Sequence, residues 1–143
     1  MDAETIDRLR AALIRISRRV DRQVSGGGLT STQLSVLASV SAHGPIVLGE
    51  LADVEGINPT MLSRVVGKLE DAGFVQREPD RDDRRVVRVA VTPAGVRLRK
   101  RLLADRSRLL AERLAGLGPE AIEALVAAMP SLEMLADELA PRR

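Results

Sequence analysis

The residues best equipped for chemistry lie between positions 58 and 68, where polar and basic side chains are predicted to share one helix. Asn58, Thr60 and Ser63 can donate hydrogen bonds to phosphates or base edges from the positive, N-terminal end of that helix. Arg64 is the strongest candidate for reading a base, because its guanidinium fork fits guanine O6 and N7 and such a contact gives about 1–3 kcal/mol of discrimination. Lys68, one turn further on, suits a phosphate better. These side chains predict contact with DNA; the alternative is an ordinary solvated helix face.

A second group of charged residues crowds the tip of a predicted β-hairpin. Asp83 can hold Arg84 or Arg85 in a carboxylate–guanidinium pair that stiffens the loop, and the other guanidinium is then free to enter a narrow minor groove. Arg77 and Arg88 lie on the flanking strands, where we expect them to contact phosphates. The alternative is a soluble turn whose charges neutralise one another.

The same inventory of residue types argues against catalysis. The sequence has no cysteine, which excludes disulfides, thiolate metal sites and thiol redox sensing. His43 is the only histidine, and we expect it to have no part in a pair of nucleophile and base. A zinc site needs three or four clustered ligands, so we do not expect His43 to bind a metal. The glycine run 26–28 has neither the spacing nor the preceding strand of a nucleotide loop. We predict a protein that is not an enzyme and needs no cofactor.

Positive charge is unevenly distributed along the chain. The net charge is only +2, yet residues 64–101 hold eleven Lys and Arg against six Asp and Glu, and residues 26–63 hold none against three. A local excess of this kind is the electrostatic footprint of a polyanion partner. No apolar run approaches the ~18 residues of a membrane span, and no signal-peptide segment opens the chain, so we expect a cytoplasmic protein without a membrane partner.

Hydrophobic residues three and four positions apart predict three helices ahead of the DNA-facing segment. They cover residues 6–24, 30–43 and 47–55. The first is expected to end at Ser25 and the glycines that follow it. The second begins with a capping box formed by Thr30 and Gln33.

The DNA-facing segment itself is predicted to be a helix followed by a hairpin. Asn58 caps the helix, Pro59 has the preset φ of a first helical residue, and Gly73 ends it. Met61, within this helix, either contacts a thymine methyl or fills the core. Strands rich in β-branched residues are predicted at 74–78 and 86–91. The expected fold is therefore mainly α with a small β-hairpin wing.

Two more helices are predicted, over residues 93–117 and from Pro119 to about Leu139. Pro130 lies inside the second, where a proline removes a hydrogen bond and is expected to kink or break the helix. The apolar stripes of the first, fifth and last helices together exceed what one small lobe can cover, so residues 1–25 and 93–143 are expected to form a helical dimerisation region. The alternative is that these stripes pack on one another within a monomer.

Taken in order, several short motifs resemble those of MarR-type transcriptional regulators over nearly the whole chain. They are ELA at 50–52, SRVV at 63–66, LE at 69–70, GFV at 73–75, Arg77, the wing residues Asp80, Asp83, Arg84 and Arg85, VAVT at 89–92, and Gly95. Singly these motifs are weak, but in this order and spacing they are specific.

The resemblance implies one domain over 1–143, with a winged helix-turn-helix lobe at 30–92. It implies a homodimer that binds a pseudopalindromic operator, usually as a repressor, and often releases it on binding a small molecule. It also implies that Arg85 is the residue inserted into the minor groove. A small anionic or apolar effector would occupy a pocket lined by leucine, valine and methionine with an arginine, because Phe74 is the only aromatic residue. The other class considered is a non-enzymatic winged-helix module that binds proteins.

Overall fold

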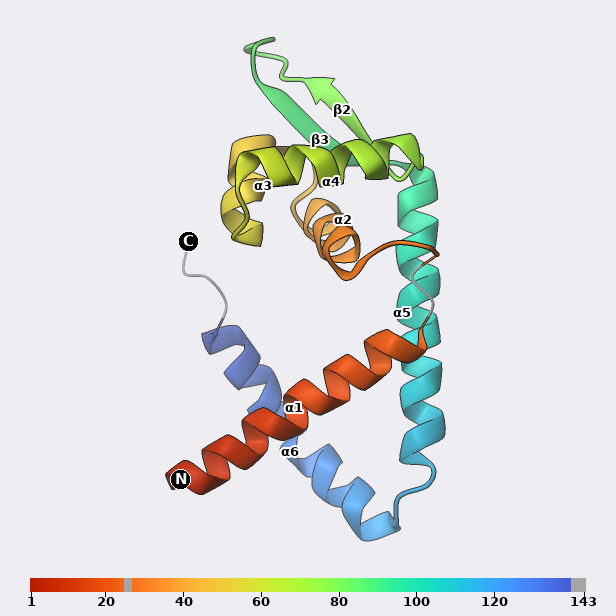
Figure 1. Ribbon diagram of the computed structural model, residues 1–143. Coiled ribbons are helices and arrows are strands. Elements are labelled where there is room, and N and C mark those ends of the chain that lie inside the picture. Colours follow the sequence, from red (N-terminus) through yellow and green to blue (C-terminus); the bar gives the residue numbers. More distant parts are fainter. Residues whose placement is uncertain (25–26, 140–143) are drawn as a thin grey trace. The chain divides into compact units, whose positions relative to one another are not determined.

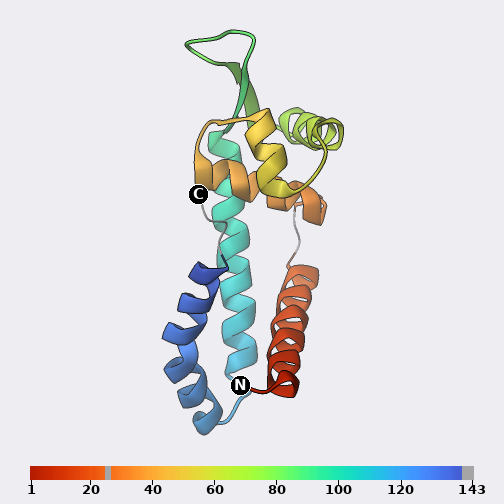
Figure 2. The ribbon, with the colours of Figure 1, turned by 90° about the vertical axis from the view of Figure 1, so that its left-hand side faces the viewer.

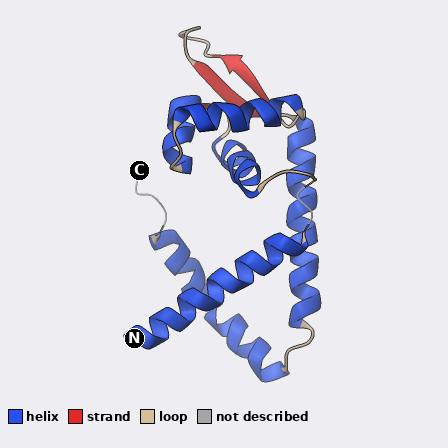
Figure 3. Ribbon diagram, in the orientation of Figure 1, coloured by secondary structure: helices blue, strands red, loops and turns tan. Residues whose placement is uncertain are grey.

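The computed structural model describes residues 1–24 and 27–139, so the predicted helix end at Ser25 and Gly26 lies outside the described residues. Its elements, in chain order, are α1 (Ala3–Gln23), α2 (Ser31–His43), β1 (Ile46–Val47), α3 (Leu48–Glu55), α4 (Pro59–Asp71), β2 (Val75–Pro79), β3 (Val87–Val91), α5 (Pro93–Leu114) and α6 (Pro119–Glu138) (Figure 1). Figure 3 shows that the chain is mainly helical and that the prominent strands form one hairpin. The predicted fold class is confirmed.

The chain divides into two compact units, Met1–Arg106 and Ser107–Arg143, and the boundary falls within α5. The first unit contains helices α1 to α4, all the described strands and the first part of α5. The second contains the end of α5 and all of α6.

The core of the first unit lies where α2, α3 and α4 meet beneath the sheet. Its largest fully buried side chains are Leu37, Leu51, Leu62 and Leu69, one from each of α2 and α3 and two from α4. Burying a leucine side chain fully contributes about 1.5–3 kcal/mol. These contacts fix the orientation of α4, because its buried residues occupy one face and its polar residues the other.

The sheet has three antiparallel strands in the order β1-β3-β2. β3 pairs with β2 from Val75↔Val91 to Pro79↔Val87, and with β1 at Ile46↔Val89. The third strand was not predicted, and assigning Val47 to the helix after it was wrong. A two-residue strand has no detectable periodicity, and only its pairing with β3 defines it. The hairpin strands start one residue later than predicted.

The predicted N-terminal caps of α2 and α4 are confirmed in atomic detail. Thr30 and Gln33 form a reciprocal capping box, with N···O distances of 2.8 and 3.2 Å. The Asn58 Oδ1 atom accepts the Met61 N–H at 2.8 Å, and Pro59 is the first residue of α4. At the other end of α4, Gly73 has a φ of 81°, a left-handed conformation that glycine adopts without a Cβ penalty. α5 ends at Leu114, three residues before the predicted 117.

The base of the hairpin is held tightly against the start of α5. A Cβ atom on Gly95 would lie 2.1 Å from the carbonyl oxygen of Phe74, so only glycine fits there. The Thr92 hydroxyl donates to the Gly73 carbonyl and accepts the Gly95 N–H at 3.1 Å. These contacts anchor the wing to the helix that follows it.

In the second unit, α6 runs through Pro130 without interruption, so the predicted break is excluded. Val126 and Met134 of α6 and Leu139, its C-cap, have exposed fractions of 65%, 70% and 77%. In the first unit, α1 likewise buries no residue and exposes Ile6 and Ile16. Within the described ranges, no helix has the length and apolar character needed to cross a membrane.

Candidate nucleic-acid interface

The exposed face of α4 carries the predicted DNA-contacting residues. Thr60, Met61, Ser63, Arg64 and Lys68 are all exposed, whereas the opposite face supplies the core. Met61 is 44% exposed, so the core-filling alternative is excluded. Figures 1 and 2 show that the β2–β3 hairpin lies at the same end of the first unit as α4 and extends past it.

Asn58 uses its side-chain oxygen to cap the start of α4. Its amide nitrogen makes no hydrogen bond to a described residue and remains available as a donor. The side chains of Arg64 and Lys68 also have no hydrogen-bond or ion-pair partner among the described residues. These three side chains of α4 and its cap therefore present hydrogen-bond donors that have no acceptor in the described part of the chain.

Arg77 connects the hairpin to α4. Its Nη2 atom donates to the carbonyl oxygen of Ser63 at 3.0 Å and to the Ser63 hydroxyl at 3.3 Å, while its backbone N–H donates to Glu70 Oε2 at 2.9 Å. The sequence suggested a phosphate contact for Arg77 but not this tether, because a contact across fourteen residues has no local signal. Besides Arg77, the shallow groove that results is lined by Pro59, Thr60, Ser63, Arg64 and Gly67.

Asp80 organises the wing loop. Its Oδ2 atom accepts the backbone N–H groups of Asp82 and Asp83, each at 3.2 Å, and its Oδ1 atom accepts from Arg88 Nε. The hydrogen bond from Arg88 is the main cause that lowers the pKa of the Asp80 carboxyl. Arg88 also donates to the Pro45 carbonyl at 3.4 Å, so the structure gives it contacts other than the predicted phosphate. Asp80 entered the sequence reasoning only through the resemblance, and its role was missed.

Of the two pairs that the sequence left open, the structure contains Asp83 with Arg85. Arg85 Nε and Nη2 donate to the two carboxylate oxygens at 3.0 and 3.1 Å, and the Arg85 N–H donates to Oδ1 at 3.0 Å. This pairing lowers the pKa of Asp83 and raises that of Arg85. The Arg85 side chain is nevertheless 90% exposed, and Arg84 has no partner in the described part of the chain. Exposed ion pairs stabilise little, so Arg85 can exchange the carboxylate for a phosphate.

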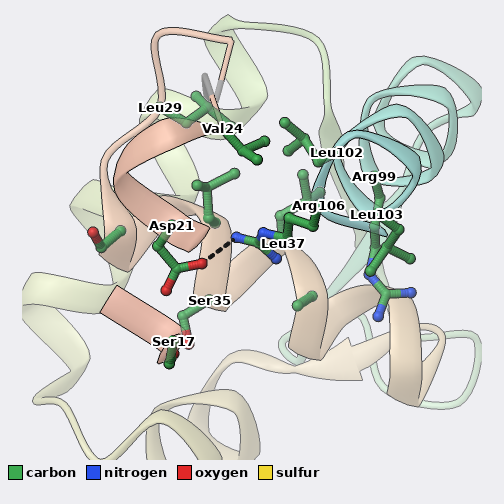
Figure 4. A pocket seen from close by; sticks show the side chains of 13 residues that line it. Ser17, Asp21, Val24, Leu29, Ser35, Leu37, Arg99, Leu102, Leu103 and Arg106 are labelled. Carbon is green, nitrogen blue, oxygen red and sulfur yellow. Dashed lines mark ion pairs between the residues drawn. The ribbon is translucent and has the colours of Figure 1, made fainter. Parts of the chain in front are cut away.

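A cavity of about 410 Å³ lies between α1, α2 and α5 within the first unit (Figure 4). Its lining includes the predicted leucines, valine and arginine, but the described residues around it contribute serines in place of methionine. Arg106 pairs with Asp21 at 3.0 Å, and its buried Nε atom has no hydrogen-bond partner among the described residues. Arg99 lines the same cavity. Among the described residues, no group of histidine, cysteine or acidic side chains could hold a metal ion.

Comparison with known proteins agrees with this geometry. The MarR family profile matches residues 29–87. An HTH-type transcriptional regulator of Mycobacterium bovis is 34% identical over 96% of both chains. The HTH-type transcriptional repressor MdtR of Bacillus subtilis is 30% identical over 78% of this chain and 72% of its own.

Solved structures share the fold. A transcriptional regulator from Thermotoga maritima superposes with a TM-score of 0.81 at 20% identity, covering 99% of this chain and all of its own. A MepR mutant of S. aureus, solved bound to an oligodeoxyribonucleotide, gives 0.70 at 17% identity, covering 96% and 98%. The relatives from Mycobacterium bovis and Bacillus subtilis are transcriptional regulators. The chain belongs to the MarR family of helix-turn-helix transcriptional regulators, a family that binds DNA.

Proposed function

We propose that this regulator is a sequence-specific, homodimeric repressor that binds a pseudopalindromic operator. The observation that carries the proposal is the exposed face of α4, where the Arg64 and Lys68 side chains have no partner among the described residues, beside an arginine-bearing hairpin at the same end of one unit. In helix-turn-helix proteins the second helix enters the major groove and its N-terminal residues reach base edges. α4 has the length, the cap and the side chains for that position.

The predicted contacts divide between helix and wing. Arg64 reads a base in the major groove, with Asn58, Thr60 and Ser63 donating nearby and Met61 placed for a thymine methyl. Lys68 neutralises a phosphate. On the wing, Arg85, which Asp83 holds in the protein without DNA, enters the minor groove, where negative potential attracts a guanidinium. The remaining candidates, Arg77, Arg84 and Arg88, are assigned to the DNA backbone.

The exposed apolar stripes support dimerisation. α1 and α6 each leave large hydrophobic side chains in solvent, and an exposed apolar stripe on a helix is typical of an interaction site. A second copy of the chain would cover these side chains and bring a second α4 and a second hairpin to the DNA. The proposed dimerisation region comprises residues 1–25 and 93–143.

A footprint on the DNA upstream of the gene tests both parts of the proposal. A protected palindrome with half-site centres about one helical turn apart is the expected result for a two-fold dimer. Protection of a single half-site would contradict the dimer. Failure to shift any upstream fragment in a gel would contradict DNA binding and favour the protein-interaction module.

The cavity between α1, α2 and α5 is the proposed effector site. Arg99 and the buried, unpartnered Nε of Arg106 suit an anion, and the leucines suit an aliphatic body. Hexanoate, used as a probe, is expected to raise the melting temperature and weaken the gel shift, and Arg99→Gln is expected to reduce both effects. If hexanoate and benzoate, tested over the same range, change neither quantity, the cavity is not an anion site.

A further inference from the structure

Gly67 lies in the interior of α4, at the ninth of its thirteen residues, and nothing in the fold requires a glycine there. Its φ is not positive, so other residues can adopt its conformation. Apart from its chain neighbours and the backbone of its own helix, a Cβ atom added to Gly67 would meet no described atom within 4 Å, in contrast to Gly95. Glycine inside a helix is less stable than alanine because it loses more conformational freedom on folding. This position therefore weakens α4 with no gain in packing.

The surroundings of Gly67 indicate what the missing side chain leaves room for. Gly67 lines the groove between α4 and β2, one turn after Ser63 and Arg64. Arg77 reaches the same groove from β2, and its Nη2 atom bonds to Ser63. Two guanidinium groups thus border the groove, and its lining includes no carboxylate among the described residues. Charge-assisted hydrogen bonds from a guanidinium such as that of Arg77 suit the oxygens of a phosphate, and Arg64 adds positive charge at the same groove.

We propose that this groove seats one phosphate of the operator backbone, and that Gly67 is the position where the DNA strand approaches the helix most closely. Glycine is the residue that permits close approach of a backbone to a ligand. Arg77 holds the phosphate from the β2 side, the bare helix surface at Gly67 forms the floor, and Arg64 borders the groove while its guanidinium reads the neighbouring base. This inference rests on the proposed DNA-binding function. It adds a positioning residue that sets the depth of α4 in the groove.

Alanine and leucine at position 67 test the proposal, with Gly49→Ala as the matched control. Gly49 is an exposed glycine within α3, and a Cβ there also meets no atom within 4 Å. Both alanine variants should melt at or a few degrees above the parent temperature, because each replaces a helical glycine. Gly67→Ala should weaken operator binding about tenfold and Gly67→Leu more, whereas Gly49→Ala should stay within about twofold. The slope of log affinity against log salt should fall by about one per subunit for the position 67 variants.

A double-mutant cycle identifies the shared phosphate. If Gly67→Ala and Arg77→Gln remove the same contact, the double variant should lose less affinity than the sum of the two single losses. Unchanged binding by Gly67→Ala would overturn the proposal, as would weaker binding with an unchanged salt slope, because then no phosphate contact was lost. If the parent protein itself binds no DNA, the proposed function fails, and this inference fails with it. A parent that binds while Gly67→Ala binds equally well removes this inference alone.

Discussion

The two parts of the candidate interface are built in opposite ways. On α4, Arg64 and Lys68 extend from a helix whose other face is buried in the core, and neither side chain has a hydrogen-bond or ion-pair partner among the described residues. On the wing, Arg85 and Arg88 are already paired with Asp83 and Asp80. The helix is rigid because of packing, and the loop is ordered by its own charges.

This difference predicts a division of labour. Side chains held by a rigid scaffold, with no competing partner, can make geometrically demanding contacts to base edges. A loop held by exposed ion pairs has a shape that depends on charge. Arg85 and Arg88 must leave their carboxylate partners in order to contact DNA. We therefore expect specificity to reside in α4, and the wing to contribute affinity that depends on salt.

The largest effect is expected for Arg64→Ala. Loss of a bidentate base contact should cost about 1–3 kcal/mol per subunit and relax the preference at one base pair of each half-site. Binding measured across single-base operator variants would show this relaxation. A uniform loss across all the operator variants would instead make Arg64 a phosphate contact and remove the contrast between helix and wing.

A smaller effect is expected for Arg85→Ala. The variant should lose affinity uniformly across operator sequences, and its salt slope should fall by about one unit per subunit. Arg84→Ala is the matched comparison, since Arg84 has no partner in the described chain whereas Arg85 is held by Asp83. Should Arg84→Ala reduce the slope while Arg85→Ala leaves affinity and slope unchanged, Arg84 is the inserted residue.

The smallest effect is expected when pH is lowered, because this protonates Asp80 and weakens the ion pair that orders the wing loop. The pKa of Asp80 is lowered from its usual 3.8, chiefly by Arg88, so its contribution to folding is present above that value and is lost as pH falls through the lowered pKa. A titration of the side-chain carboxyl by NMR should place Asp80 below 3.8 in the parent, and Arg88→Gln should move it back toward that value. An unchanged pKa in the variant would show that Arg88 does not hold the loop.

The sequence predicted the helical part of the interface well because its signals are local. Asn58, Pro59 and Gly73 mark the start and end of α4, and the apolar spacing between them orients its exposed face. The wing was predicted only in outline. The choice of Arg85 over Arg84 as the partner of Asp83, the central place of Asp80 and the tether from Arg77 to Ser63 depend on side-chain geometry that composition does not encode.

By itself, the sequence determined the order of the helices and hairpin strands, the capped helix α4 and the arginine-rich hairpin, and its motifs indicated the MarR family by resemblance. The helices and the hairpin follow from periodicity, capping and turn residues, which act over a few positions along the chain. Tertiary structure alone decided that a two-residue strand joins the sheet, that Met61 is exposed, and that Gly67 faces a groove bordered by two arginines. The physical reason is that pairing, burial and groove shape arise between segments far apart in the chain, where local patterns contain no information about contact.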